Sequence, residues 1–306
     1  MTMVRGKILY QNGHFPTIDP ADPYALTDAE QSLIDSLTHA FRHSKALRKH
    51  IEFLYNDGAL YKTCNGNLLF HGCVPMTPDG PCDAATSFDG VTRKGRAYMD
   101  FCDKTARAAF YEHSQDALDF MYYLWCGRQS PLFGRERMTT FERYFVADRK
   151  TWTETKNPYY DLVESYETAT FILREFGLDE KTGHIINGHV PVRAAIGEPP
   201  VKARGRYIRI DGGFCRAYHD RTGIAGYTLI YTSKGLRLVS HSPFEGKKAA
   251  VRENRDILAA DDVIFEMMPH RMLVRDTDYG KRIIERMADL RALLDAYREG
   301  VVSPES

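Results

Sequence analysis

Residues 65–75 read NGNLLFHGCVP, and residues 183–192 read GHIINGHVPV. Each stretch contains a short apolar run that ends in a histidine followed by a turn. Apolar runs this short, bounded by Gly and Pro, favour buried strands over helices. We therefore predict two strands that each leave the sheet beside a histidine, His71 in the first stretch and His189 in the second.

A rigid sheet can hold a histidine at the end of each strand, so that both imidazoles face one shared pocket. A neutral imidazole in such a position is a natural metal ligand. The alternative is that His71 and His189 are hydrogen-bonded side chains at strand ends without a metal. Spacing alone leaves both interpretations open.

Helices and further strands are expected on both sides of these two stretches. A leading helix over 27–58 begins with a capping box at Thr27–Glu30, and a terminal helix over 279–299 carries one apolar stripe. The other predicted elements are helices near 98–110, 118–125 and 166–176, a strand near 207–210, and a hairpin of 227–231 with 236–241. Together they predict one α/β domain over residues 1–306.

Composition excludes several classes of protein. The chain has 306 residues, 43% of them hydrophobic, and 41 Lys and Arg balance 41 Asp and Glu. Such a chain can bury a core, and its zero net charge argues against nucleic acid or an anionic membrane as the main partner. It has no apolar run near the roughly 20 residues of a bilayer helix, and no secretory signal opens it. We expect a soluble, cytoplasmic protein whose six cysteines stay reduced.

The two histidine stretches resemble the late histidine motifs of the calcineurin-like metallophosphoesterases. Longer stretches resemble the class III, or Firmicutes-type, fructose-1,6-bisphosphatases. The resemblance runs from about residue 6 to about residue 244, and it is carried by FGRERMTTFERYF (133–145), KNPYY (156–160), IDGGFCRAY (210–218) and TGIAGYTL (222–229).

This resemblance implies an α/β fold, the C-terminal part of a calcineurin-like metallophosphoesterase β-sandwich flanked by helices. The chain should contribute mainly the second sheet, with strands near Leu68, Ile185, Ile208, Tyr227 and Leu236. The implied activity is hydrolysis of fructose 1,6-bisphosphate to fructose 6-phosphate and phosphate, a step of gluconeogenesis in carbohydrate metabolism.

Manganese in a dinuclear site is the implied cofactor, and a metal-activated water is the implied nucleophile. His71 and His189 would ligate the second metal through one ring nitrogen each. A hydrogen-bond acceptor that does not touch the metal would then orient the other nitrogen of each ring.

The sequence departs from the superfamily in its early motifs. It contains no Asp-x-His, no Gly-Asp-x-x-Asp-Arg-Gly and no Gly-Asn-His, since Gly66-Asn67 is followed by Leu68. Those motifs supply the first metal's ligands and the catalytic histidine, so no catalytic residue is assigned in this chain. Two ligands cannot hold a dinuclear site. We therefore expect the C-terminal half of the enzyme, a fragment that works with an N-terminal half or through self-association.

The substrate's two phosphates call for Arg or Lys. Each candidate cation has the alternative role of a solvated or structural charge. Asp211 is a candidate for orienting a histidine or a backbone amide, or it caps the Gly212-Gly213 turn. The candidate phosphate ligands are Arg143 and Arg216 first, followed by Arg135, Arg137 and Lys202.

Two other functions stay open. The chain could be a non-catalytic subunit that pairs with a separate N-terminal half, which predicts a large exposed apolar face. It could also be another calcineurin-like phosphatase, such as a relative of the phosphoprotein phosphatases. A panel of substrates would separate that class from a sugar bisphosphatase.

Overall fold

The computed structural model describes residues 3–4, 7–8, 15–213, 222–223, 226–241, 246–254 and 259–302. The chain divides into two compact units, where the sequence predicted one domain. Unit 1 comprises Met1–Leu60 and Cys73–Tyr160, and unit 2 comprises Tyr61–Gly72 and Asp161–Ser306. His71 therefore belongs to the same unit as His189, whereas the last three residues of the first histidine stretch, 73–75, belong to unit 1.

Unit 1 is mainly helical. Its core is formed where α3 and α4 pack together, with Tyr98, Cys102, Phe120 and Leu124 buried between them. These two helices confirm the predictions near 98–110 and 118–125. The elements of the unit are β1 (Met3–Val4), β2 (Lys7–Ile8), α1 (Asp28–His43), α2 (Lys45–Asp57), β5 (Ala85–Thr86), β6 (Thr92–Arg93), α3 (Gly95–Tyr111), α4 (Gln115–Cys126), α5 (Thr140–Phe145) and the 3-10 helix η1 (Arg149–Trp152).

The predicted leading helix is two helices. The capping box is confirmed, because the Glu30 backbone N–H donates to the Thr27 hydroxyl and the Thr27 N–H donates to the Glu30 carboxylate. The prediction of one continuous helix to residue 58 is wrong at Ser44. That residue leaves the helical conformation and accepts a hydrogen bond from the Leu47 N–H, so it caps a second helix.

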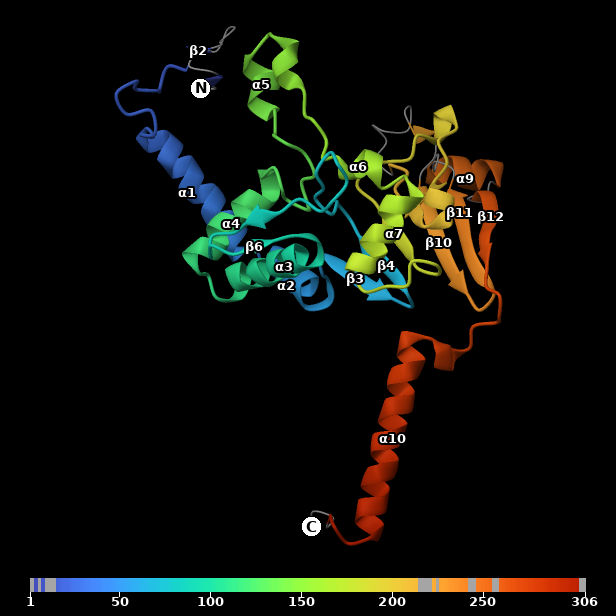
Figure 1. The fold of residues 1–306 in the computed structure, drawn as a ribbon. Helices are drawn as coiled ribbons and strands as arrows, with labels where there is room; N and C mark the ends of the chain where they lie inside the picture. The colour runs from blue at the N-terminus through green and yellow to red at the C-terminus, as the bar shows by residue number, and fades with distance from the viewer. Residues whose placement is uncertain are drawn as a thin grey trace. The chain divides into compact units, whose positions relative to one another are not determined.

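Unit 2 contains the five-stranded and three-stranded sheets and the terminal helix. The helices predicted near 166–176 and over 279–299 are confirmed as α7 and α10, and Figure 1 shows α10 as one uninterrupted helix. A short helix, α6 (Tyr159–Leu162), spans the junction of the units. The elements of unit 2 are β3 (Tyr61–Cys64), β4 (Asn67–Phe70), α7 (Tyr166–Glu175), β7 (His184–Asn187), η2 (Ala194–Ile196), β8 (Val201–Lys202), η3 (Ala203–Gly205), β9 (Tyr207–Arg209), β10 (Gly226–Thr232), β11 (Gly235–His241), α9 (Lys247–Glu253), β12 (Ala259–Met267), η5 (Val274–Asp276) and α10 (Asp278–Arg298).

A five-stranded mixed sheet has the order β3-β4-β7-β9-β8. Strands β4, β7 and β9 are parallel, and the outer strands β3 and β8 run antiparallel to their neighbours. The register pairs Phe70 of β4 with Asn187 of β7. All four residues of β7 are buried, as the apolar run predicted. The carboxyl ends of β4 and β7 therefore lie side by side at one edge of the sheet.

The five predicted strands are present, but they belong to two sheets rather than one. Leu68, Ile185 and Ile208 lie in the five-stranded sheet, whereas Tyr227 and Leu236 lie in a three-stranded sheet of order β10-β11-β12. The predicted hairpin is confirmed as β10 and β11. Its second strand pairs on its other side with β12, an element that the sequence did not predict.

An apolar cluster joins the two sheets of unit 2. Ile186 of β7, Ile208 of β9 and Leu238 of β11 are buried together. Polar contacts also connect the two sheets. Glu266 of β12 accepts a hydrogen bond from the guanidinium of Arg206, the residue before β9, and its carboxylate lies 2.6 Å from the His184 ring of β7. The described part of the molecule is thus a mixed α/β structure. Among the helices that it contains, none has both the length and the apolar surface needed to cross a membrane.

Candidate functional site

The two predicted histidines meet at one edge of the five-stranded sheet. His71 follows β4 directly, and His189 follows β7 after Gly188. Because β4 and β7 are parallel neighbours, both histidines leave the sheet at the same end. The Nε2 atom of His71 lies 3.2 Å from the Nδ1 atom of His189, and the rings are almost perpendicular, at 85°.

Local backbone geometry makes this approach possible. A Cβ atom at Gly188 would lie 3.2 Å from His71 Nδ1, so glycine leaves room for the imidazole. His189 has a φ of 65°, a left-handed conformation that is uncommon for a residue with a side chain. Backbone hydrogen bonds from Val192 N–H to the Asp211 carbonyl and from Ile210 N–H to the Asn187 carbonyl hold the segment in this shape. Strain of this kind is concentrated at functional sites.

The two nitrogens lie at hydrogen-bond distance, and their separation also matches the spacing of two ligands on one metal ion. Two imidazole nitrogens that each lie about 2.1 Å from one ion are about 3.0 to 3.4 Å apart. The observed separation of 3.2 Å falls within this range. Within the described residues no group of three or more His, Cys, Asp or Glu side chains could hold a metal. A metal ion at this pair would therefore need further ligands besides the two histidines.

The backbone of Asp211 is hydrogen-bonded to the segment that follows His189. Its carbonyl accepts the Val192 N–H, and its carboxylate accepts the Gly213 N–H at 2.8 Å. The carboxylate therefore caps the Gly212-Gly213 turn, one of the two roles that the sequence left open. A role in orienting a histidine stays a prediction.

The three arginines of the 133–145 stretch surround one segment of unit 1. Arg135 forms an ion pair with Glu154, Arg137 donates to the Thr153 carbonyl, and Arg143 donates to the Thr139 hydroxyl and the Trp152 carbonyl. These contacts tie the start of α5 to the segment that follows η1. A phosphate would have to compete with them for the same guanidinium groups.

Lys202 sits among carboxylates. Its Nζ atom lies 2.5 Å from Glu164 and 2.7 Å from Glu198, and its side chain is 11% exposed. Both carboxylates would have to release Lys202 before it could contact a phosphate. Arg216, the other candidate of the second half of the chain, lies outside the described residues.

The sequence did not predict the polar network that lies next to the histidine segments. Asn187 and Arg209 are 1% and 3% exposed, and Tyr207 is fully buried. Asn187 donates to three carbonyls of the His71 segment, and Arg209 reaches the same carboxylates as Lys202. One signal was present in the sequence, since an arginine within an apolar strand needs a buried partner.

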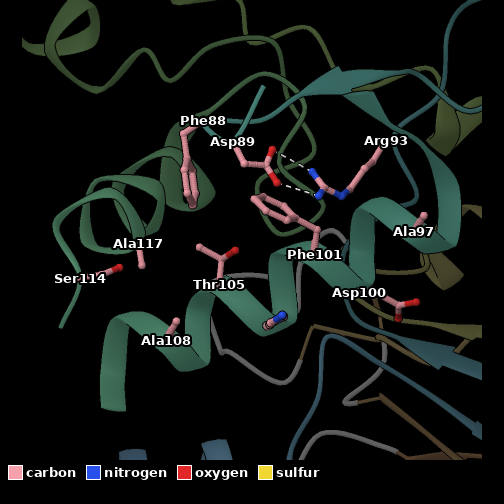
Figure 2. A pocket seen from close by; sticks show the side chains of 11 residues that line it. Phe88, Asp89, Arg93, Ala97, Asp100, Phe101, Thr105, Ala108, Ser114 and Ala117 are labelled. Atoms are coloured by element: carbon pink, nitrogen blue, oxygen red, sulfur yellow. Dashed lines mark hydrogen bonds and ion pairs between the residues drawn. The ribbon is translucent and has the colours of Figure 1, made fainter. Parts of the chain in front are cut away.

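Unit 1 contains a separate hollow of about 500 Å³ beside α3. Phe88 and Phe101 form its apolar wall, and the Arg93 guanidinium lies 4.4 Å above the Phe101 ring. Figure 2 shows Arg93 joined to Asp89 by paired hydrogen bonds, at 2.7 and 3.0 Å. Because this ion pair satisfies the guanidinium, the hollow is mainly an apolar depression.

Three comparisons with known proteins bear on this site. A family model described as Firmicute fructose-1,6-bisphosphatase matches residues 3–299. The chain is 49% identical over 296 residues to the fructose-1,6-bisphosphatase class 3 of Clostridium novyi (strain NT), covering 95% of this chain and 44% of that protein. It is 48% identical over 305 residues to the protein of the same name from Listeria monocytogenes serotype 4b (strain CLIP80459), covering 98% of this chain and 46% of that protein.

The chain thus spans less than half the length of the curated relatives that it matches. No solved structure matches it.

Proposed function

The chain belongs to the Firmicute fructose-1,6-bisphosphatase family, and we propose that it forms part of an enzyme that hydrolyses fructose 1,6-bisphosphate to fructose 6-phosphate and phosphate. The observation that carries this proposal is the match of nearly the whole chain to relatives of that name, together with a histidine pair at ligand spacing. The reaction is a step of gluconeogenesis. A doubly phosphorylated sugar does not pass a bilayer, so the proposed location is the cytoplasm.

His71 and His189 would hold a divalent cation in this enzyme, with manganese as the proposed metal. The 3.2 Å separation of their nitrogens supports this proposal, because two ligands of one ion lie about that far apart. When bound, a divalent metal pair lowers the pKa of a coordinated water and neutralises charge on the phosphoryl oxygens. The chain's contribution is to present His71 Nε2 and His189 Nδ1 from a rigid sheet edge, so that ordering them costs little when the metal binds.

The other metal ligands and the catalytic histidine would come from residues that correspond to the rest of the relatives' length. The two described ligands alone cannot complete a site. In this proposal unit 2 supplies part of the two-sheet sandwich of calcineurin-like metallophosphoesterases. The apolar cluster that joins its sheets supports this assignment.

Phosphate recognition is proposed for the arginines of the family-like stretches. Arg143 and Arg216 are the first candidates, followed by Arg135 and Arg137. Among the candidates that the structure describes, Lys202 is the least accessible, because two carboxylates already hold it. Asp211 is proposed to hold the His189 segment through its backbone carbonyl.

A second function is a non-catalytic subunit that pairs with a separate N-terminal half. The observation in its favour is the exposed apolar surface of α1, α2 and α10, which suits a partner surface. A different calcineurin-like phosphatase has less support, because relatives that share almost half of their matched residues with this chain are named for the sugar bisphosphate.

The test is phosphate release from fructose 1,6-bisphosphate with Mn²⁺. The purified chain is assayed alone and mixed with the separately expressed remainder of a class 3 relative. His71→Ala and His189→Ala variants serve as controls, and circular dichroism verifies that each chain is folded. We expect activity in the mixture and its loss in both variants.

Activity of the chain alone that disappears in His189→Ala would mean that this chain holds a complete site. Hydrolysis of a phosphopeptide in preference to the sugar would favour the phosphoprotein phosphatases. A mixture that stays inactive with folded components would contradict the proposed function, and a mixture whose activity survives both histidine variants would support the subunit alternative.

A further inference from the structure

Asn187 connects the two segments that carry the histidines. It lies two residues before His189, and its side-chain amide nitrogen donates to the carbonyls of Phe70, His71 and Gly72 at 3.1, 3.0 and 3.0 Å. An amide group has two hydrogens, so the three carbonyls share them. One side chain at the end of β7 therefore binds three consecutive carbonyls of the turn that contains His71.

The buried neighbours of Asn187 fix the direction of its amide. The Arg209 guanidinium can only donate, so the contact of its Nε atom with the Tyr207 hydroxyl at 3.3 Å makes that oxygen an acceptor. The hydroxyl hydrogen is then available to the Asn187 Oδ1 atom, 3.1 Å away. With its oxygen engaged by Tyr207, Asn187 must turn its nitrogen toward the His71 turn.

A cluster of ion pairs holds Arg209 in turn. Its guanidinium donates to Glu198 at 2.9 Å and to Glu164 at 3.1 Å, and Lys202 contacts the same two carboxylates. Arg193 also donates to Glu198, so three cations share two carboxylates, and these opposite charges reduce the cost of burying Arg209 and Lys202. The chain of contacts runs from this cluster through Tyr207 to Asn187 and ends at the backbone of His71.

We infer that Asn187 is a positioning residue that sets the spacing of His71 Nε2 and His189 Nδ1 before a metal binds. The inference rests on the proposed function, because it assumes that this pair ligates a metal. Tyr207 supports it by orienting the amide. Groups that orient metal ligands typically change metal affinity by roughly 10–100-fold when they are removed.

The test uses Zn²⁺ as the probe, because imidazole sites bind it more tightly than Mn²⁺. Its affinity for the chain is measured by competition with a chromophoric chelator. Contacts between the rings of His71 and His189 are followed without metal by NMR. The variants are Asn187→Ala, and Tyr207→Phe, which keeps the ring and removes one hydroxyl.

Asn67→Ala is the matched control. Asn67 is also a buried asparagine of the same sheet, and its amide donates to the carbonyls of Cys64 and Asn65 at the opposite end of β4. We expect Asn187→Ala to weaken Zn²⁺ binding roughly 10–100-fold and Tyr207→Phe to weaken it by less. Asn67→Ala should lower thermal stability while it leaves the Zn²⁺ affinity within about threefold of the wild type.

Failure of the inference can be distinguished from failure of the proposed function. If His71→Ala and His189→Ala abolish Zn²⁺ binding but the folded Asn187→Ala variant binds like the wild type, Asn187 does not position the pair. Equal losses in Asn187→Ala and Asn67→Ala would also overturn the inference. If the histidine variants bind Zn²⁺ as the wild type does, the proposed metal pair is wrong. The metal-free NMR measurement gives an independent check. If the contacts between the His71 and His189 rings persist in Asn187→Ala, Asn187 does not position the pair.

Discussion

At the scale of single residues, Gly134 shows how a backbone conformation limits substitution. Its φ is 62°, and a Cβ atom there would collide with the buried Tyr160 ring and its hydroxyl. We expect Gly134→Ala to lower the free energy of unfolding by roughly 2–4 kcal/mol, because left-handed strain and overpacking act together. Urea denaturation followed by circular dichroism measures the loss.

Gly197→Ala separates these two causes. Gly197 has a φ of 78°, but a Cβ atom there would meet nothing within 4 Å. This variant should lose only about 1 kcal/mol, the part due to the left-handed backbone. If the two variants lost equal stability, the contact with Tyr160 would not be the cause.

At the scale of elements, the ion pairs of Lys202 in β8 and Arg209 in β9 with Glu164 and Glu198 should make the free energy of unfolding depend on pH. Burial raises the pKa of Glu198, but hydrogen bonds from Lys202 and Arg193 and the charge of Lys202 outweigh it and hold the pKa at about 2, below the ordinary 4.5. Because the folded-state pKa is depressed, this stabilisation is complete above about pH 4.5. It is lost as the pH falls toward 2.

The expected result is a free energy of unfolding that falls between pH 5 and pH 2. Glu198→Gln should cost up to about 3 kcal/mol at pH 7, and its difference from the wild type should shrink toward pH 2. Glu180→Gln is the control, because Glu180 forms a surface ion pair with Arg174 and should contribute less than about 1 kcal/mol. A pH-independent effect of Glu198→Gln would argue against the depressed pKa.

At the scale of the whole molecule, α10 presents an apolar stripe to solvent. Its members recur at alternating steps of four and three, and each is between 37% and 57% exposed: Ile283, Met287, Leu290, Leu294 and Tyr297. That spacing is the heptad pattern of helix pairing. We expect the purified chain to self-associate, with an apparent mass that rises with concentration in sedimentation velocity.

A Leu290→Lys, Leu294→Lys double variant should reduce this association, because two charges would enter the apolar stripe. Ala288→Lys with Ala292→Lys adds the same charge at positions outside the stripe, so it should leave association nearly unchanged. A wild-type chain that stays monomeric at all concentrations tested would show that the exposed stripe does not drive self-association.

Local patterns predicted the elements well. The capping box at Thr27 and the apolar runs at Leu68 and Ile185 each gave the correct type of element, because neighbouring residues determine them. The continuation of the first helix past Ser44 was predicted wrongly, because the apolar periodicity on both sides hides a serine cap. Strand β12 was missed, and with it the division of the strands into two sheets.

The linear sequence was sufficient for the family, the two strand-exit histidines and most helices, since motifs and periodicity are local properties of the chain. The register of β4 against β7 joins residues more than a hundred positions apart, so only the folded chain shows that His71 Nε2 and His189 Nδ1 lie 3.2 Å apart. The same holds for the contacts from Asn187 through Tyr207 to Arg209. Such contacts depend on long-range pairing of the strands, which no local pattern encodes.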